Sequence, residues 1–307
     1  MTKGFVVNTP YDDVFRTMLN DCSHLIIPVI NEIFCENYRG DEKIVFSPEI
    51  HFVNQQDGEE TKRITDSSFE IIGEKETKFL LECQSTADSS MLIRIFEYAT
   101  QIALDQGELE NNVLKVEIPR SAILFLRSNG ATPDKMTIEI KTPGGVNSFD
   151  VPVMKAQKYS IDDIFEKGLL FLIPFYIFSH ESRFQEYELD EDALKELKIE
   201  YMEIVKRLDS LLESGSISVY TKKMIVEMSN KVVNHLAQKY DNVKEGVTSI
   251  MGGKVLEYEA KQILNEGKMK QAKETAQVLR EMGMNEESIA KAVNVSVGIL
   301  KEWLGAN

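Results

Sequence analysis

Residues 78–84 read Lys-Phe-Leu-Leu-Glu-Cys-Gln, in which three apolar side chains precede an acid, a thiol and an amide. Such a run is typical of a strand that is buried along most of its length. Side chains alternate between the two faces of a strand, so Glu82 and Gln84 share one face while Cys83 points to the other. A carboxylate at the end of a buried strand is an unusual placement. Glu82 is therefore the first candidate site residue.

A second strand is expected over Arg63–Ile72, and the turn Gly73–Lys75 separates it from the first. If the hairpin closes through those three residues, residues whose numbers sum to 148 lie opposite each other. Asp66 then faces Glu82, with Cβ atoms about 5 Å apart. Two carboxylates this close repel unless a cation lies between them. Oxygen ligands with no His or Cys side chain on that face favour Mg²⁺ or Mn²⁺, although a slip in register would separate the acids.

An ordinary explanation stays open, because the chain has 50 Asp and Glu residues and acids are common on solvent-facing strand positions. The helix expected over Ser90–Leu109 supports a site. On it Arg94, Tyr98 and Gln101 follow one another at helical spacing and form one polar face. An arginine there could neutralise the two acids or hold a phosphate. The alternative for this face is a solvated surface with an ordinary ion pair.

The rest of the first 159 residues mixes helix and strand patterns. Asp12–Phe34 has apolar residues at helical spacing, with a break near residues 21–23 and a kink at Pro28. Three further strands are expected, at Glu49–Gln55, Ser121–Arg127 and Met136–Lys141. The predicted fold class is α/β, with a mixed sheet flanked by helices and followed by an all-α C-terminal region.

Strand patterns stop at Ser160, and helical patterns follow. Ser160 with Asp163 resembles an N-terminal cap and predicts a helix through Phe178. A heptad seam comes next, formed by Leu194, Leu197, Tyr201, Ile204, Leu208 and Leu211. A second apolar stripe begins at Ile225, after a break at Ser214–Ser216. The short connection favours an antiparallel helix hairpin within one chain, and a dimerising coiled coil stays open as the alternative.

The tail over residues 253–307 ends in two short helical patterns, Ser288–Val293 and Ile299–Leu304, with a tight junction between them. This is the outline of a helix-turn-helix. From Lys254 onward the tail has eight Lys or Arg and eight Asp or Glu, so it is neutral. Because a DNA reader is usually basic, a helical cap or a partner-docking element is favoured over DNA reading.

The composition limits the classes of function. Lys and Arg number 35 against 50 Asp and Glu, a net charge of −15, so any DNA contact has to be local or mediated by a metal. Cys22, Cys35 and Cys83 have no metal-ligand spacing and fit a reducing compartment. The longest apolar stretch, Leu169–Phe178, is too short for a membrane span of roughly 20 residues. With no signal-peptide pattern at the N-terminus, we expect a cytoplasmic protein. The signatures of P-loop ATPases, Rossmann dehydrogenases and α/β-hydrolases are also absent from the sequence.

The order of these motifs resembles the PD-(D/E)XK nuclease fold, in which an Asp on one strand precedes Glu-x-Lys on the next strand and then a helix. More narrowly, the chain resembles the recombination-promoting nucleases, a family also described as transposases of the PD-(D/E)XK type. The matching motifs are Asp12–Arg16 with Arg16 in place of a Lys, Asp66, Glu82–Gln84, and the pair Arg94 and Tyr98. The tail from Asn265 to Leu304 also resembles the family's Gly/Glu/Lys-rich extension.

The resemblance implies a metal-dependent nuclease site. In it Asp66, Glu82 and the main-chain carbonyl of Cys83 would ligate Mg²⁺ or Mn²⁺. Gln84 takes the place of the Lys of the wider fold, and as a neutral amide it can orient a water only by hydrogen bonding. Asp12 would polarise a further water or hold a second metal, and an ordinary acid at a helix N-terminus is the equal alternative. The resemblance also implies three contacts to DNA phosphates, at Arg94, Tyr98 and Arg16.

We therefore expect a nuclease-like domain over residues 1–159, a helical region with an antiparallel hairpin over 160–252, and a helical tail over 253–307. The expected function is metal-dependent endonucleolytic hydrolysis of double-stranded DNA, in recombination or in a mobile element. The alternative is a catalytically weak, nuclease-derived interaction protein that forms homo-oligomers through its helical half, which Gln84 and the acidic charge favour. A transcriptional regulator that uses the terminal helix-turn-helix is a third interpretation. No membrane partner is expected.

Overall fold

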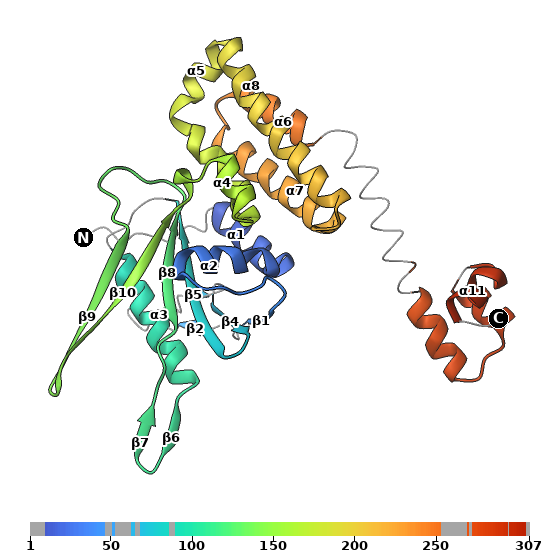
Figure 1. Cartoon of the computed structure of the whole chain (residues 1–307), viewed down its shortest axis with the longest axis horizontal. Helices are drawn as coiled ribbons and strands as arrows, with labels where there is room; N and C mark the ends of the chain where they lie inside the picture. The colour runs from blue at the N-terminus through green and yellow to red at the C-terminus, as the bar shows by residue number, and fades with distance from the viewer. Residues whose placement is uncertain are drawn as a thin grey trace, which may run out of the picture.

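The computed structural model describes residues 10–46, 51–52, 63–64, 68–85, 90–252, 269, 272–293 and 295–304. A six-stranded sheet with helices on both faces forms one end of the molecule, and a bundle of helices adjoins it (Figure 1). The predicted α/β class with a helical C-terminal part is thereby confirmed. Within these residues no helix combines the length and the apolar character needed to cross a bilayer.

The central sheet has the strand order β1-β4-β5-β8-β10-β9. Its strands are β1 (Lys43–Phe46), β4 (Ser68–Ile72), β5 (Glu76–Gln84), β8 (Arg120–Phe125), β10 (Gly145–Lys155) and β9 (Lys135–Thr142). The three strands β5, β8 and β10 are parallel, and the remaining pairs are antiparallel. The carboxyl ends of the parallel strands therefore meet at one edge, the place where open α/β sheets usually bind ligands.

Two short ribbons accompany the sheet. One pairs β2 (His51–Phe52) with β3 (Arg63–Ile64), and the other pairs β6 (Glu108–Glu110) with β7 (Val113–Lys115). The strand expected over residues 49–55 is thus seen only at residues 51–52 of the described chain. The β6–β7 ribbon was not foreseen from the sequence.

The β4–β5 hairpin has the predicted register. Its pairs run from Ser68 opposite Leu80 to Ile72 opposite Glu76, and the residue numbers in each pair sum to 148. The hairpin therefore closes through residues 73–75, as expected. Asp66 lies outside the described residues, so its pairing with Glu82 stays a prediction.

The two faces of the sheet bury separate groups of side chains. Three helices cover these faces: α1 (Pro10–Asp21), α2 (Ile26–Phe34) and α3 (Met91–Asp105). Leu81 and Cys83 belong to the cluster that includes α1 and α2. Leu80 belongs to the second cluster, with Tyr98 of α3. The alternation predicted for residues 78–84 is therefore confirmed.

The break expected near residues 21–23 is present, because α1 ends at Asp21 and a 3₁₀ turn η1 (Ser23–Leu25) leads into α2. Pro28 lies in the first turn of α2 rather than at a kink. The first N–H groups of a helix have no intrahelical partner, so a proline removes no helical hydrogen bond there. The change of direction occurs at η1 instead.

The predicted cap at Ser160 is confirmed. The Ser160 hydroxyl accepts a hydrogen bond from the Asp163 backbone N–H at 3.1 Å, and the Ser160 backbone N–H donates to Asp163 Oδ2 at 3.0 Å. This reciprocal pair satisfies two backbone donors and starts the helix α4 (Ile161–Glu166).

The predicted continuation of that helix through Phe178 is wrong. Gly168 has a φ of +68°, a left-handed conformation that ends an α-helix. A 3₁₀ helix η3 (Leu170–Arg183) follows, with Pro174 inside it. η3 is buried along most of its length, and its side chains belong to the cluster that also contains residues of the sheet and of the helical bundle. It therefore connects the two parts.

Four further helices complete the bundle, α5 (Phe184–Leu189), α6 (Glu191–Glu213), α7 (Val219–Leu236) and α8 (Asp241–Met251). The heptad seam lies on α6, and all of its residues are buried except Leu211, which is half-buried. α6 packs against α5 and α8, and less extensively against α7. The intramolecular packing of the seam is confirmed, whereas the expected two-helix hairpin is only one part of a larger bundle.

One cluster of buried side chains extends from α1 to α8 and so joins the sheet to the bundle. Tyr11 of α1 meets Phe178 of η3 edge-on, with ring centroids 4.9 Å apart. Asp13 of α1 also forms an ion pair with Lys231 of α7. The predicted boundary at residue 160 stays a prediction, but the regions on its two sides share this cluster.

The described part of the tail consists of the helical residues 272–281, α10 (Glu286–Ala292) and α11 (Val297–Leu304). Both helical patterns expected at the end of the chain lie in α10 and α11. Ile289 and Leu300 are fully buried in a small cluster that contains tail residues alone. The tail helices therefore have a core of their own.

Candidate functional site at the carboxyl edge of the sheet

The last residues of β5 carry the candidate acid and amide. Leu80 packs in the cluster beneath α3, and side chains two apart on a strand share a face. Glu82 and Gln84 therefore lie on the α3 face, where both are half-buried. Cys83 points to the opposite face and is buried.

α3 brings two further predicted residues to this layer. It begins at Met91, soon after β5 ends at Gln84. Tyr98 is buried in the same cluster as Leu80, and Arg94 lies one helical turn before it, half-buried. The structure thus gathers Glu82, Gln84, Arg94 and Tyr98 on one side of the sheet, as the sequence predicts.

α1 approaches the end of β5 from the other side. Burial raises the pKa of the Cys83 thiol well above its ordinary value, and the charges of Asp12 and then Glu82 raise it further. Asp12 is therefore near the strand end, in the first turn of a helix that contacts β5. Arg16 follows one turn later on α1 and is half-buried.

The environment of Cys83 restricts what this residue can do. Its thiol stays protonated at neutral pH, because burial and two nearby carboxylates disfavour the thiolate. The thiol also lies on the face of β5 opposite Glu82 and Gln84, so it does not share the face of the candidate acid.

The metal-ligand set is only partly within the described residues. They contain no group of three or more His, Cys, Asp or Glu residues arranged to hold a metal ion. Asp12 and Glu82 are present at the strand end, and Asp66 lies outside the described residues. The donors that are present are carboxylate oxygens, which fit a hard divalent cation.

Arg127 is a residue of this edge that sequence reasoning missed. It follows β8, and its guanidinium binds Glu181 of η3 through two hydrogen bonds, Nε to Oε2 at 2.5 Å and Nη2 to Oε1 at 2.8 Å. Its third nitrogen, Nη1, donates to the main-chain oxygen of Ser85 at 3.4 Å. The guanidinium carbon also lies 4.9 Å from the ring centroid of Phe178.

These contacts place a permanent cation beside the end of β5. The hydrogen bonds with Glu181 raise the pKa of Arg127 further above an already high value. The backbone N–H of Leu126 donates to the main-chain oxygen of Gln84 at 2.8 Å, which fixes β8 against the candidate amide. The sequence signal for Arg127 was a charged residue at the end of a buried strand. The same signal identified Glu82.

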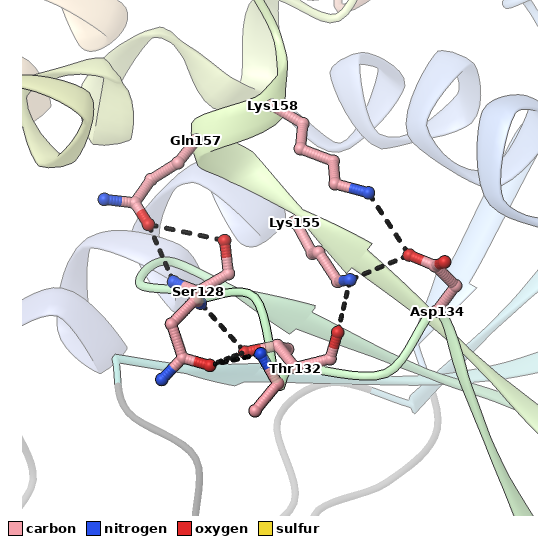
Figure 2. A network of polar contacts seen from close by, with 8 residues as sticks. Ser128, Thr132, Asp134, Lys155, Gln157 and Lys158 are labelled. Carbon is pink, nitrogen blue, oxygen red and sulfur yellow. Dashed lines mark hydrogen bonds and ion pairs between the residues drawn. The ribbon is translucent and has the colours of Figure 1, made fainter.

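The loop after β8 is fixed onto the end of β10 by a second group of polar contacts (Figure 2). Lys155 Nζ donates to Asp134 Oδ1 at 2.7 Å and to the main-chain oxygen of Thr132, and Lys158 Nζ lies 3.2 Å from the same Asp134 oxygen. Hydrogen bonds from Lys155 and Lys158 hold the pKa of Asp134 below its usual range. Ser128 N–H donates to Gln157 Oε1 at 2.7 Å.

Lys155 belongs to the same row of residues as the candidate amide. Gln84 pairs with Phe125 across β5 and β8, and Phe125 pairs with Lys155 across β8 and β10. Val153, two residues earlier on β10, packs on the α3 face, so Lys155 shares that face. The carboxyl edge thus combines acids on β5 and α1 with cations on β10, on α3 and after the end of β8.

Comparisons with known proteins find no relative: no protein-family model, curated protein or solved structure matches this chain. The resemblance to a nuclease family therefore rests on the order of the motifs. The roles expected of the site residues stay predictions.

Proposed function

We propose that this protein is a metal-dependent DNA endonuclease that hydrolyses phosphodiester bonds. The observation that carries the proposal is the end of β5, where Glu82 and Gln84 lie on the α3 face and Asp12 approaches the same strand end from α1. In the β4–β5 hairpin the numbers of paired residues sum to 148. Asp66 belongs to this site if the same register continues from Ser68 back to residue 66.

Asp66, Glu82 and the main-chain oxygen of Cys83 are the proposed metal ligands. When bound there, Mg²⁺ or Mn²⁺ would lower the pKa of a water and neutralise charge on the scissile phosphate. The Cys83 side chain is buried on the opposite face of β5, so the proposed ligands are all oxygen atoms, in keeping with these hard cations.

The remaining residues act on the water and on the DNA. The Gln84 amide orients the attacking water by hydrogen bonding and brings no charge of its own. Arg94 and Tyr98, on the same face, and Arg16 on α1 bind backbone phosphates of double-stranded DNA. Asp12 polarises a further water at the strand end. The net charge of −15 makes the local cations Arg94 and Arg16 necessary for DNA binding.

Cleavage of supercoiled plasmid tests this proposal. Purified protein should nick or cut plasmid with Mg²⁺ or Mn²⁺ and be inactive in EDTA. Asp66→Ala and Glu82→Ala should each abolish cutting and leave the circular dichroism spectrum and the melting temperature close to those of the wild type. Unchanged cutting by both variants would refute the assignment of the site.

One observation favours the second candidate function, a nuclease-derived interaction protein with little catalysis. Gln84 is neutral at a position where the wider fold has a positive charge. Under this alternative the plasmid stays intact with either metal, while the protein still binds DNA or a second copy of itself. The nuclease proposal requires cutting, so the same assay decides between the two functions.

A further inference from the structure

The β6–β7 ribbon, with the two residues after it, forms a two-stranded arm over residues 108–117 that projects from the sheet domain, beyond the end of α3 (Figure 1). Its turn residues Asn111 and Asn112 have φ values of +49° and +63°. Two positive φ values are typical of a type I′ turn, whose twist matches that of the flanking strands. The ribbon is therefore a well-formed hairpin.

The arm exposes the aliphatic side chains that a sheet normally buries. Leu109 and Leu114 face each other across the two strands, and 77% and 54% of their surfaces are exposed. Val113 and Val116 of the same arm and Leu104 at the end of α3 are also exposed. None of the arm residues belongs to a core cluster of the described chain.

A hairpin of two strands is only marginally stable in water, and three or more strands with an apolar face are needed for a stable sheet. The described residues provide no third strand on either side of this arm. Unpaired strand edges with apolar side chains are sites of pairing with another chain. The unpaired edges of β6 and β7, beside the exposed Leu109 and Leu114, are therefore sites where a partner can add strands.

We propose that the partner is a second copy of this chain, and that β7 pairs antiparallel with β7 of that copy across a two-fold axis at Leu114. The result is a four-stranded sheet in the order β6-β7-β7-β6. Its one face carries a row of four leucines, Leu109 and Leu114 from each copy. This inference concerns the arm alone and does not depend on the proposed nuclease activity.

The charges of the arm select β7 as the pairing edge. In a β6 to β6 pair centred on Leu109, Glu108 of each copy would face Glu110 of the other, and like charges directly opposite destabilise a sheet. In the β7 pair centred on Leu114, Lys115 faces Val113 instead. Pairing of β6 with β7 leaves one β6 edge and one β7 edge free and would propagate into open chains, whereas the two-fold pair leaves only two β6 edges, whose glutamates disfavour further pairing.

The same charges disfavour DNA as the occupant. The arm carries Glu108, Glu110 and Glu117 against Lys115. Lys115 is already paired with Glu110, at 2.7 Å between Nζ and Oε2. A phosphate backbone would meet net negative charge on this arm and gain no unpaired cation.

Oligomeric state, measured by sedimentation over a range of protein concentrations, tests the proposal. The wild type should be a dimer, and Leu109→Ser with Leu114→Ser should weaken association at least about tenfold, because the two Leu114 side chains no longer pack against each other and Leu109 no longer packs beside Leu114. Val146→Ser is the matched control, since Val146 is 60% exposed on the separate β9–β10 hairpin. A wild type that stays monomeric, or a double variant that associates as tightly as the wild type, would overturn the proposal.

Disulfide trapping tests the register and avoids any dependence on folding of the serine variant. In a Cys35→Ser background, which removes the exposed cysteine, Leu114→Cys should oxidise to a covalent dimer. The two copies of residue 114 lie opposite each other in the proposed pair, about 5 Å apart between Cβ atoms. Leu109→Cys should not, because its copies are three strand spacings apart, about 14 Å. Failure of Leu114→Cys to cross-link, or equal cross-linking at both positions, would contradict this register.

Discussion

Replacement of Arg127 by methionine removes the cation that connects the end of β8 to η3. The variant keeps most of the side-chain volume and leaves Glu181 without its two hydrogen bonds from Arg127. The Ser85 main-chain oxygen also loses a donor. We expect the sheet and the bundle to stay folded but to be held together less firmly.

The expected loss of unfolding free energy follows from how far the Arg127–Glu181 ion pair is exposed. Breaking a fully buried ion pair costs about 3–5 kcal/mol, whereas a fully exposed pair contributes under about 1 kcal/mol. The side chains of Arg127 and Glu181 are 30% and 33% exposed, so the pair lies between these limits. We expect a loss of about 1–2 kcal/mol in the free energy of unfolding, which lowers the melting temperature by roughly 3–6 °C.

Urea denaturation of a double-mutant cycle measures this contact. Arg127→Met, Glu181→Gln and the double variant give a coupling energy of about 1–2 kcal/mol if the pair acts as described. Arg183→Met with Glu186→Gln is the control, because that pair is exposed and three residues apart on the chain and should couple by less than about 0.5 kcal/mol. Additive effects of Arg127→Met and Glu181→Gln would refute the reasoning.

Three further predictions follow from the burial and charges of single residues. Leu197→Ala should lower the free energy of unfolding by about 2–5 kcal/mol, because Leu197 is fully buried. Ile199 is exposed, so Ile199→Ala should change the free energy of unfolding by less than about 0.5 kcal/mol in the same urea titration. The hydrogen bond with His180 holds the pKa of Glu200 below its ordinary value, so this carboxylate stabilises the fold at neutral pH and the contribution is lost as the pH falls through the lowered pKa. The stability difference between the wild type and Glu200→Gln should therefore shrink on acidification, and a difference that stays constant to about pH 3 would contradict this. Gln84→Ala should slow plasmid cutting roughly tenfold, while Gln84→Lys should cut at least as fast as the wild type. A Lys variant as slow as the Ala variant would show that the site does not accept a lysine side chain.

Local patterns predicted the sheet well. The register of β4 and β5 followed from a three-residue turn and from alternation, because a slip would have placed Leu80 on the wrong face. The cap at Ser160 and the burial of the seam on α6 likewise follow from short stretches of sequence. The same patterns placed Glu82 and Gln84 on the face of α3, as the structure has them.

Features that depend on distant contacts could not be predicted in this way. The helix expected through Phe178 ends early because Gly168 adopts a left-handed conformation, and the apolar run that follows is equally compatible with the 3₁₀ helix η3. The Arg127–Glu181 pair joins residues 54 positions apart, and no local spacing indicates it. The position of Asp12 depends on how α1 packs on the end of β5, which is also a tertiary property.

The proposed function requires the carboxylate of Glu82, at the end of β5, for metal-dependent cutting. Glu82→Gln removes that charge at nearly constant shape. Glu70→Gln makes the same change on β4, where Glu70 shares the α3 face but accepts a hydrogen bond from Gln106 at the other end of α3, at 3.1 Å. The most direct measurement is the initial rate of plasmid cutting with Mn²⁺ for these two variants and the wild type. We expect Glu70→Gln to cut like the wild type and Glu82→Gln to leave the plasmid intact; equal rates for both variants would contradict the account.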